Sequence, residues 1–165
     1  MVNGPLPASG FEEFLAIAQE RSIPWRFESQ VVRYADRIAI EDGPQSWTYQ
    51  SLNEAANRIA RAILQNQELD NNPVALFFSP GFNAIASILG VLKAGRAWVP
   101  MVPGDPIDRL RVLLSEASSF LVLTDFSQID SAKLLARSDA KIMKIEDIIG
   151  SGTANDLEMA ITPET

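Results

Sequence analysis

The sequence contains no cysteine and no histidine. Without cysteine there can be no disulfide, no thiolate nucleophile and no cysteine-ligated zinc site. Without histidine there can be no Ser–His–Asp triad and no imidazole acid–base catalysis, and most transition-metal sites are excluded too. The absence of cysteine, and so of disulfides, also fits a reducing compartment, and we expect a cytoplasmic location.

An excess of basic residues is also missing. Lys and Arg total 14 against 21 Asp and Glu, which gives a formal net charge of −7 and an isoelectric point near 4.6. Nucleic acids and anionic membrane surfaces both attract a basic footprint, so this balance predicts that neither is a partner.

Long apolar runs are lacking as well. The longest one, residues 84–92, contains Ser87 and Gly90 and falls far short of the roughly 20 residues that span a membrane. The first ten residues have neither a basic segment nor an apolar core, so they do not predict a signal peptide.

What remains is an ordinary globular composition in 165 residues, with 47% hydrophobic and 21% charged residues. This length predicts one domain. Residues 1–10, with two prolines and two glycines, are predicted to be a flexible lead-in. The folded part is predicted to cover residues 11–148, and the Gly-, Ser- and acid-rich residues 149–165 to form a linker.

In the first half of the chain the spacing of apolar residues predicts helices over 11–20 and 26–34, with a break at Ile23-Pro24-Trp25. Residues 37–41 and 46–48 are predicted to be paired strands around a turn. Thr48 is predicted to cap a helix with Glu54 and Arg58 paired on its wet face. The apolar face of this helix is formed by Leu52, Ala55, Ala56, Ile59, Ala60, Ile63 and Leu64.

In the second half, apolar strands alternate with helices. The strands are predicted at 74–78, 97–102, 120–124 and 141–145, and the helices at 82–93, 106–117 and 127–137. Gly95 is predicted to end the first of these helices, and Asp105 to cap the second. This alternation predicts an α/β fold with a mostly parallel sheet and helices on its faces.

Two stretches have the general appearance of phosphate-binding loops. Ser79-Pro80-Gly81 lies between a predicted strand and the start of a helix, where α/β proteins bind phosphate. It has one glycine and no motif lysine, so an ordinary helix-starting turn is the favoured interpretation. Gly150-Ser151-Gly152-Thr153 is followed by Asp156 and Glu158 rather than by a cation, and is interpreted as linker.

The other candidate residues also have structural explanations. Asp105 and Asp108 fit capping and favourable charges at a helix start, and Lys93 fits the negative end of the helix dipole. The acids Glu146, Asp147, Asp156 and Glu158 lack the spacing of a calcium loop and fit a solvated surface. Trp47, Trp98 and Tyr49 fit the core or the sheet surface. The residues alone therefore predict no catalytic, cofactor-binding or metal-binding site in this chain.

Two motifs nevertheless resemble a known family. Ser46 to Ala60, SWTYQSLNEAANRIA, resembles the first core motif of the adenylation domains of nonribosomal peptide synthetases, in which (T/S)Y-x-x-L opens a long helix. The residues that carry the match are Thr48, Tyr49, Leu52, Asn53, Ala56, Asn57 and Ala60.

The second motif, Leu92 to Pro103, reads LKAGRAWVPMVP and resembles the family pattern LKAGxAYVPxDP. The matching residues are Leu92, Lys93, Ala94, Gly95, Ala97, Val99, Pro100 and Pro103. Trp98 replaces the usual Tyr, Val102 the usual Asp, and Gly104-Asp105 the usual Ser-Tyr. Residues 27–40 and 106–124 resemble family segments too, so the likeness runs from about Trp25 to Asp125.

The resemblance implies the N-terminal portion of an enzyme that activates an amino acid with ATP and Mg²⁺ and transfers it to the phosphopantetheine of a carrier protein. In the family the phosphate loop, the adenine and ribose contacts and the substrate pocket follow this region. The chain ends at Thr165, about where the phosphate loop would begin. We therefore expect no ATP or Mg²⁺ to be bound by this chain, and no activity from it alone.

The partners that the resemblance implies are the rest of the adenylation domain and the carrier protein. A cut across a large domain would expose apolar surface, so self-association is a further expectation. Two alternatives stay open at this point. One is a non-catalytic interaction module or split-enzyme subunit from the same family, and the other is an unrelated small Rossmann-like ligand binder.

Overall fold

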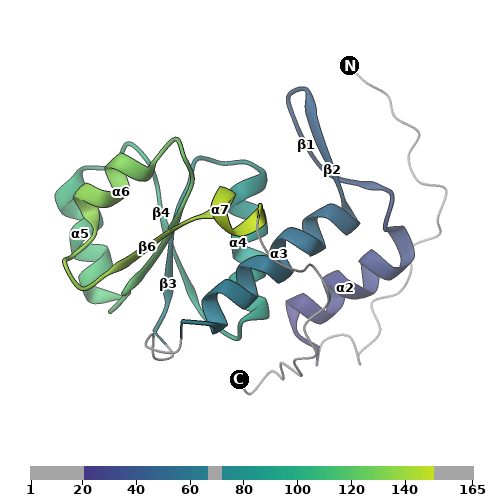
Figure 1. Cartoon of the computed structure of the whole chain (residues 1–165), viewed down its shortest axis with the longest axis horizontal. Coiled ribbons are helices and arrows are strands. Elements are labelled where there is room, and N and C mark those ends of the chain that lie inside the picture. The colour runs from purple at the N-terminus through teal and green to yellow at the C-terminus, as the bar shows by residue number, and fades with distance from the viewer. Residues whose placement is uncertain (1–20, 67–71, 151–165) are drawn as a thin grey trace.

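The computed structural model describes residues 21–66 and 72–150. The predicted helix over residues 11–20, most of the predicted linker and the candidate residues Asp156 and Glu158 lie outside these ranges. Within them, a four-stranded parallel sheet is flanked by helices, and a two-stranded hairpin projects away from it (Figure 1).

The described part begins with helix α2, Ile23–Tyr34. The predicted break at Ile23-Pro24-Trp25 is wrong, because Pro24 lies inside the first turn. Proline is tolerated there, since the N–H that it lacks would have no partner within the helix. Ser22 caps the helix, and its side chain accepts a hydrogen bond from the Trp25 amide at 3.3 Å.

The predicted hairpin and the long helix after it are confirmed. Strands β1, Ile38–Asp42, and β2, Gln45–Thr48, pair antiparallel. Thr48 caps helix α3, Tyr49–Leu64, by accepting from the Ser51 amide at 3.1 Å. The predicted pair of Glu54 and Arg58 on the outer face of α3 is replaced by other contacts. The Glu54 carboxylate accepts a hydrogen bond from the Gln50 side chain, and the Arg58 guanidinium donates one to the Ile149 carbonyl.

The parallel sheet is built from β3, Val74–Phe77, β4, Trp98–Met101, β5, Leu121–Thr124, and β6, Lys141–Lys144. All three pairings are parallel, and the spatial order is β4-β3-β5-β6. The α/β fold with a parallel sheet is confirmed.

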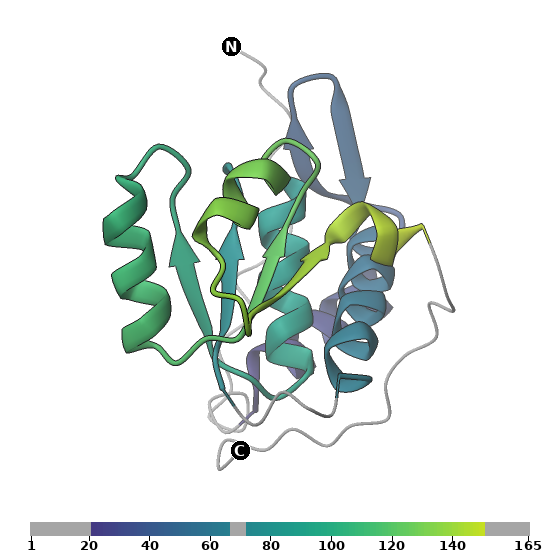
Figure 2. The same ribbon diagram turned by 60° about the vertical axis from the view of Figure 1, so that its left-hand side comes forward.

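Helices cover both faces of this sheet (Figure 2). Helix α4, Phe82–Lys93, packs with α3 over one face, and α5, Ile107–Glu116, with α6, Ile129–Leu135, covers the other. The larger core therefore lies between the sheet and the α3–α4 pair, and α2 lies outside that pair. No helix in residues 21–66 and 72–150 is long and apolar enough to cross a membrane.

Two helix ends test the predicted capping residues. Gly95, with φ 69°, ends α4 as predicted: its amide donates to Leu92 and that of Arg96 to Val91. Asp105 does not cap α5, because Pro106 occupies the N-cap and the Asp105 carboxylate lies 3.7 Å from Arg109.

The last helix was missed. The predicted final strand, 141–145, ends at Lys144, and α7, Ile145–Ile149, follows at once. Ile145 and Ile148 are buried against the larger core, which explains why these residues form a helix.

Candidate functional site at the carboxyl edge of the sheet

The strand order reverses beside β3. The chain passes from β3 to β4 on one side and then returns to place β5 on the other. In open α/β sheets, ligands bind beyond the carboxyl ends of the strands at such a reversal. The loop after β3, residues 78–81, and the loop after β5, residues 125–128, therefore form the candidate site.

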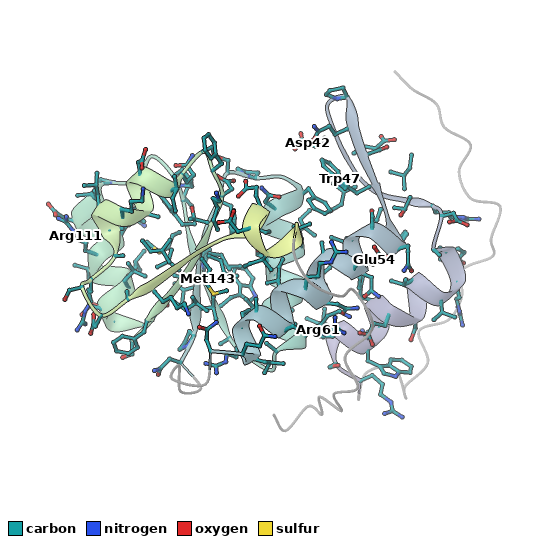
Figure 3. The ribbon with its side chains drawn as sticks, in the orientation of Figure 1. Asp42, Trp47, Glu54, Arg61, Arg111 and Met143 are labelled. Atoms are coloured by element: carbon teal, nitrogen blue, oxygen red, sulfur yellow. The ribbon has the colours of Figure 1, made fainter. Side chains whose placement is uncertain are left out.

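The first loop faces a carboxylate. Gly81 adopts φ 154° at the start of α4, and a Cβ added there would lie 2.9 Å from Asp42 Oδ2. Asp42 belongs to the hairpin, which carries it toward this end of the sheet (Figure 3). An anion bound at the positive end of α4 would meet this negative charge, so the geometry favours the turn interpretation of Ser79-Pro80-Gly81 over a phosphate site.

The polar groups of the second loop form hydrogen bonds with neighbouring residues of this chain. Asp125 is buried, and its Oδ1 accepts from the Ser127 hydroxyl at 2.6 Å and the Gln128 amide at 3.1 Å. The amide of Phe126 donates to Glu146 at 3.0 Å. These bonds fix the turn into α6, which makes Asp125 a structural residue.

A side-chain hydrogen bond also links the carboxyl ends of β3 and β5. Thr124 is fully buried at the end of β5, and its hydroxyl donates to the Phe77 carbonyl at 3.1 Å. The sequence reasoning did not single out Thr124 or Asp125. A Thr-Asp pair directly after an apolar strand was the available signal, since polar residues at that point must be satisfied by neighbouring backbone.

Lys93 is in the last turn of α4, as the dipole interpretation requires, but it also has a specific partner. Its side chain is buried and forms an ion pair with Glu28 of α2. The pair lies at the C-terminal end of α4, whereas the candidate site lies at the N-terminal end of that helix. Lys93 is therefore a structural residue that joins α2 to α4.

The remaining candidate acids pair with neighbouring cations or backbone. Asp108 bonds Arg111 at 3.2 Å on α5, and Asp147 pairs with Lys144 at 3.1 Å. Within the described residues, no group of three or more Asp, Glu, His or Cys could hold a metal ion. A divalent cation would thus find no ready ligand set in this part of the chain.

The three candidate aromatic residues are packing residues. Trp47 of the hairpin stacks on Phe82 of α4, with ring centroids 4.5 Å apart. The ring centroids of Tyr49 and Phe27 lie 6.0 Å apart, and Trp98 packs against the larger core. Gly150 follows α7, and the rest of the Gly150–Thr153 stretch lies outside the described residues.

Comparison with known proteins places the chain in a family. The family described as AMP-binding enzyme matches residues 27–162, and the chain belongs to it. The predicted likeness to the N-terminal part of a nonribosomal peptide synthetase adenylation domain is confirmed by similarity to several synthetases in sequence and structure.

Three synthetases illustrate the sequence similarity. A plipastatin synthase subunit of Bacillus subtilis is 37% identical over 78% of this chain and 4% of its own length. Tyrocidine synthase 3 of Brevibacillus parabrevis is 33% identical over 85% of the chain and 2% of its own length. Tyrocidine synthase 1 of the same organism is 36% identical over 67% of the chain and 10% of its own length. The chain thus spans a small part of each relative.

Solved structures agree on the fold. The nonribosomal peptide synthetase FmoA3, in its α-methyl-L-serine-AMP-bound form, has a TM-score of 0.80 and 23% identity over 87% of this chain and 16% of its own. The N-terminal subdomain of Klebsiella oxytoca NpsA has a TM-score of 0.70 and 20% sequence identity over 87% of this chain and 36% of its own length.

Proposed function

We propose that this chain is the N-terminal scaffold portion of an amino-acid-activating adenylation domain. The parent polypeptide, in which residues 1–165 continue into the rest of that domain, would join an amino acid to AMP with release of pyrophosphate. It would then transfer the aminoacyl group to the phosphopantetheine thiol of a carrier protein. The family match over residues 27–162 is the observation that carries this proposal.

The residues at the carboxyl edge of the sheet do not fit ATP and Mg²⁺. Asp42 faces the start of α4 beside the strand reversal, and Asp125 accepts hydrogen bonds within the turn that leads into α6. An adenylation step needs cations and preorganised donors around the triphosphate, so we derive no step of the reaction from these residues. The proposed role of this portion is to support the groups that the remainder supplies.

The domain boundaries belong to the same proposal. Residues 11–148 would form the folded portion, and 149–165 would lead toward the phosphate loop. The carrier protein and the remainder of the domain would be the partners, in a cytoplasmic enzyme. We propose no nucleic-acid partner and no membrane partner, in keeping with the net charge of −7.

The test is amino-acid-dependent ATP–pyrophosphate exchange, run with each proteinogenic amino acid. We expect no exchange above background from the 165-residue chain and clear exchange with at least one amino acid from the parent polypeptide. Exchange by the 165-residue chain would refute the scaffold role. A folded parent polypeptide that supports no exchange would refute the proposed activity.

A non-catalytic interaction module from the same family is the second candidate. The observation that favours it is exposed apolar surface on α2, where Ile23 is 61% and Val32 87% exposed. Such a module would bind a partner through this helix without any exchange activity. Light scattering at increasing concentrations of the 165-residue chain would detect self-association, and a monomer throughout would count against an oligomerisation role.

A further inference from the structure

Helix α7 is held in place by other parts of the fold. It consists of Ile145–Ile149, and an isolated helix shorter than about 12 residues is marginal in water. The buried side chains of Ile145 and Ile148 attach it to the larger core. Two further hydrogen bonds, one near each end of the helix, join α7 to α3 and to the candidate site.

The bond to α3 comes from an arginine. The Arg58 guanidinium, on the outer face of α3, donates to the carbonyl of Ile149, 91 positions further along the chain. The last carbonyls of a helix have no partner within it, and a cation there also suits the negative end of the helix dipole. Arg58 therefore caps the C-terminal end of α7 from another element. Helix α7 lies against α3 (Figures 1 and 2).

The other bond reaches the candidate site. The Glu146 carboxylate, in the first turn of α7, accepts from the Phe126 amide at 3.0 Å. Phe126 belongs to the loop after β5, residues 125–128, at the strand reversal. The Gly150 amide closes α7 by donating to the Glu146 carbonyl at 3.0 Å. A movement of α7 would therefore shift Glu146 and release the Phe126 amide.

Helix α7 also fixes the path of the chain at the carboxyl edge of the sheet. It follows directly after β6, which ends at Lys144, so α7 begins at the edge where the candidate site lies. Under the proposed function, the chain beyond α7 leads toward the phosphate loop of the parent polypeptide. The end of α7 that Arg58 caps is the end from which the chain continues.

We propose that Arg58 is a positioning residue for the adenylation reaction of the parent polypeptide. Arg58 acts through α7, because it holds both the loop 125–128 and the point from which the chain continues toward the phosphate loop. This inference rests on the proposed function, which supplies the reaction and its substrate ATP. A misplacement of about 1 Å, caused far from the reacting atoms, can lower a rate by about 100-fold. A bond on the outer face of α3 can thus affect how ATP is held.

A purely structural role for Arg58 would have a different kinetic signature. A variant that only lowered the folded fraction would reduce kcat per total enzyme and leave the KM for ATP unchanged. A variant that displaced the groups around ATP would instead raise the KM for ATP. Arg58→Met removes the donor but keeps a long unbranched side chain, and Arg58→Lys keeps both the charge and a donor.

Hydrogen exchange of single amides, followed by NMR, tests the first step without any turnover. In the 165-residue chain Arg58→Met should speed exchange of the Gly150 amide by about tenfold or more, while the amides of the central strand β5 stay protected. Arg58→Lys should recover most of the protection. Arg111→Met is the matched control, since it removes a similar bond, to the Leu134 carbonyl at 2.9 Å, and should leave Gly150 unchanged. Unchanged Gly150 exchange in Arg58→Met would overturn the proposal.

Pyrophosphate exchange by the parent polypeptide tests the second step. Arg58→Met should raise the KM for ATP by about fivefold or more, and change the KM for the activated amino acid by less than about twofold. Arg58→Lys and Arg111→Met should stay within about twofold of the unsubstituted protein for both. An unchanged KM for ATP in folded Arg58→Met, or an equal rise in Arg111→Met, would overturn the proposal.

Failure of this inference differs from failure of the proposed function. Normal exchange by the unsubstituted parent polypeptide, with an unaltered KM for ATP in Arg58→Met, refutes this inference alone. A folded parent polypeptide that supports no exchange before any substitution refutes the proposed function, and this inference with it.

Discussion

Lys93 and Glu28 form an ion pair between α4 and α2, 65 positions apart in the sequence. The two partners are buried unequally, since the Lys93 side chain is 3% exposed and that of Glu28 is 36% exposed. Losing one partner of a buried pair leaves the other charge uncompensated, and the cost depends on how deeply the remaining charge is buried. The pair should therefore respond asymmetrically to substitution.

We predict that Glu28→Gln lowers the free energy of unfolding by about 3 kcal/mol, because it leaves the buried ammonium of Lys93 without its counter-charge. Lys93→Met should cost less, since an apolar chain of similar volume fills the site and Glu28 can reach water. Urea denaturation measures both. Lys133→Met removes the exposed pair with Asp130 and serves as the control, with an expected cost below about 1 kcal/mol. A larger cost for Lys93→Met than for Glu28→Gln would contradict the asymmetry.

The close approach of α3 and α4 gives a second prediction. A Cβ added at Gly90 would lie 2.6 Å from Ile59 Cγ2 and 3.0 Å from the Ala56 carbonyl oxygen. Gly90→Ala should therefore destabilise the chain by about 2 kcal/mol or more, although alanine favours a helix over glycine by about 1 kcal/mol.

Thermal unfolding with a second glycine variant separates the clash from backbone strain. Gly104 has φ 101° and open space around it, so Gly104→Ala should cost only the strain of about 1–2 kcal/mol. A stabilising Gly90→Ala would show that the helices can move apart at no cost.

A stacking contact joins the hairpin to α4. A two-stranded hairpin is marginal alone, and Trp47 on Phe82 ties this one to α4. We predict that Trp47→Ala raises amide exchange in β1 and β2 by about tenfold or more while β3 and β5 stay protected. Trp25→Ala, on partly exposed α2, is the control and should leave the hairpin unchanged. Unaltered hairpin exchange in Trp47→Ala would show that other contacts hold it.

The Thr124 hydroxyl gives the last prediction. Thr124→Val keeps the shape of the side chain but removes the donor to the Phe77 carbonyl, and should cost about 1–2 kcal/mol. Thr124→Ser keeps the hydroxyl and should recover the part of that loss that is due to the bond. If valine proves as stable as threonine in guanidinium unfolding, the bond contributes nothing to stability.

Several elements followed from the sequence because their causes are local. The helical spacing from Leu52 to Leu64, the cap at Thr48 and the helix stop at Gly95 all act within a few residues. The alternation of apolar strands and helices implied a parallel sheet, and the two motifs identified the family. The errors at Pro24, Asp105 and α7 are at element ends, where one proline or a few buried side chains decide the boundary.

The sequence alone therefore determined the α/β class, the order of the strands and the family. Only the tertiary structure decided that β5 lies beside β3 and that Lys93 meets Glu28. It also decided that Asp42 lies against the start of α4. The physical reason is that periodicity and capping reflect neighbours along the chain. Strand order and ion pairing depend on how distant segments pack to bury a common core.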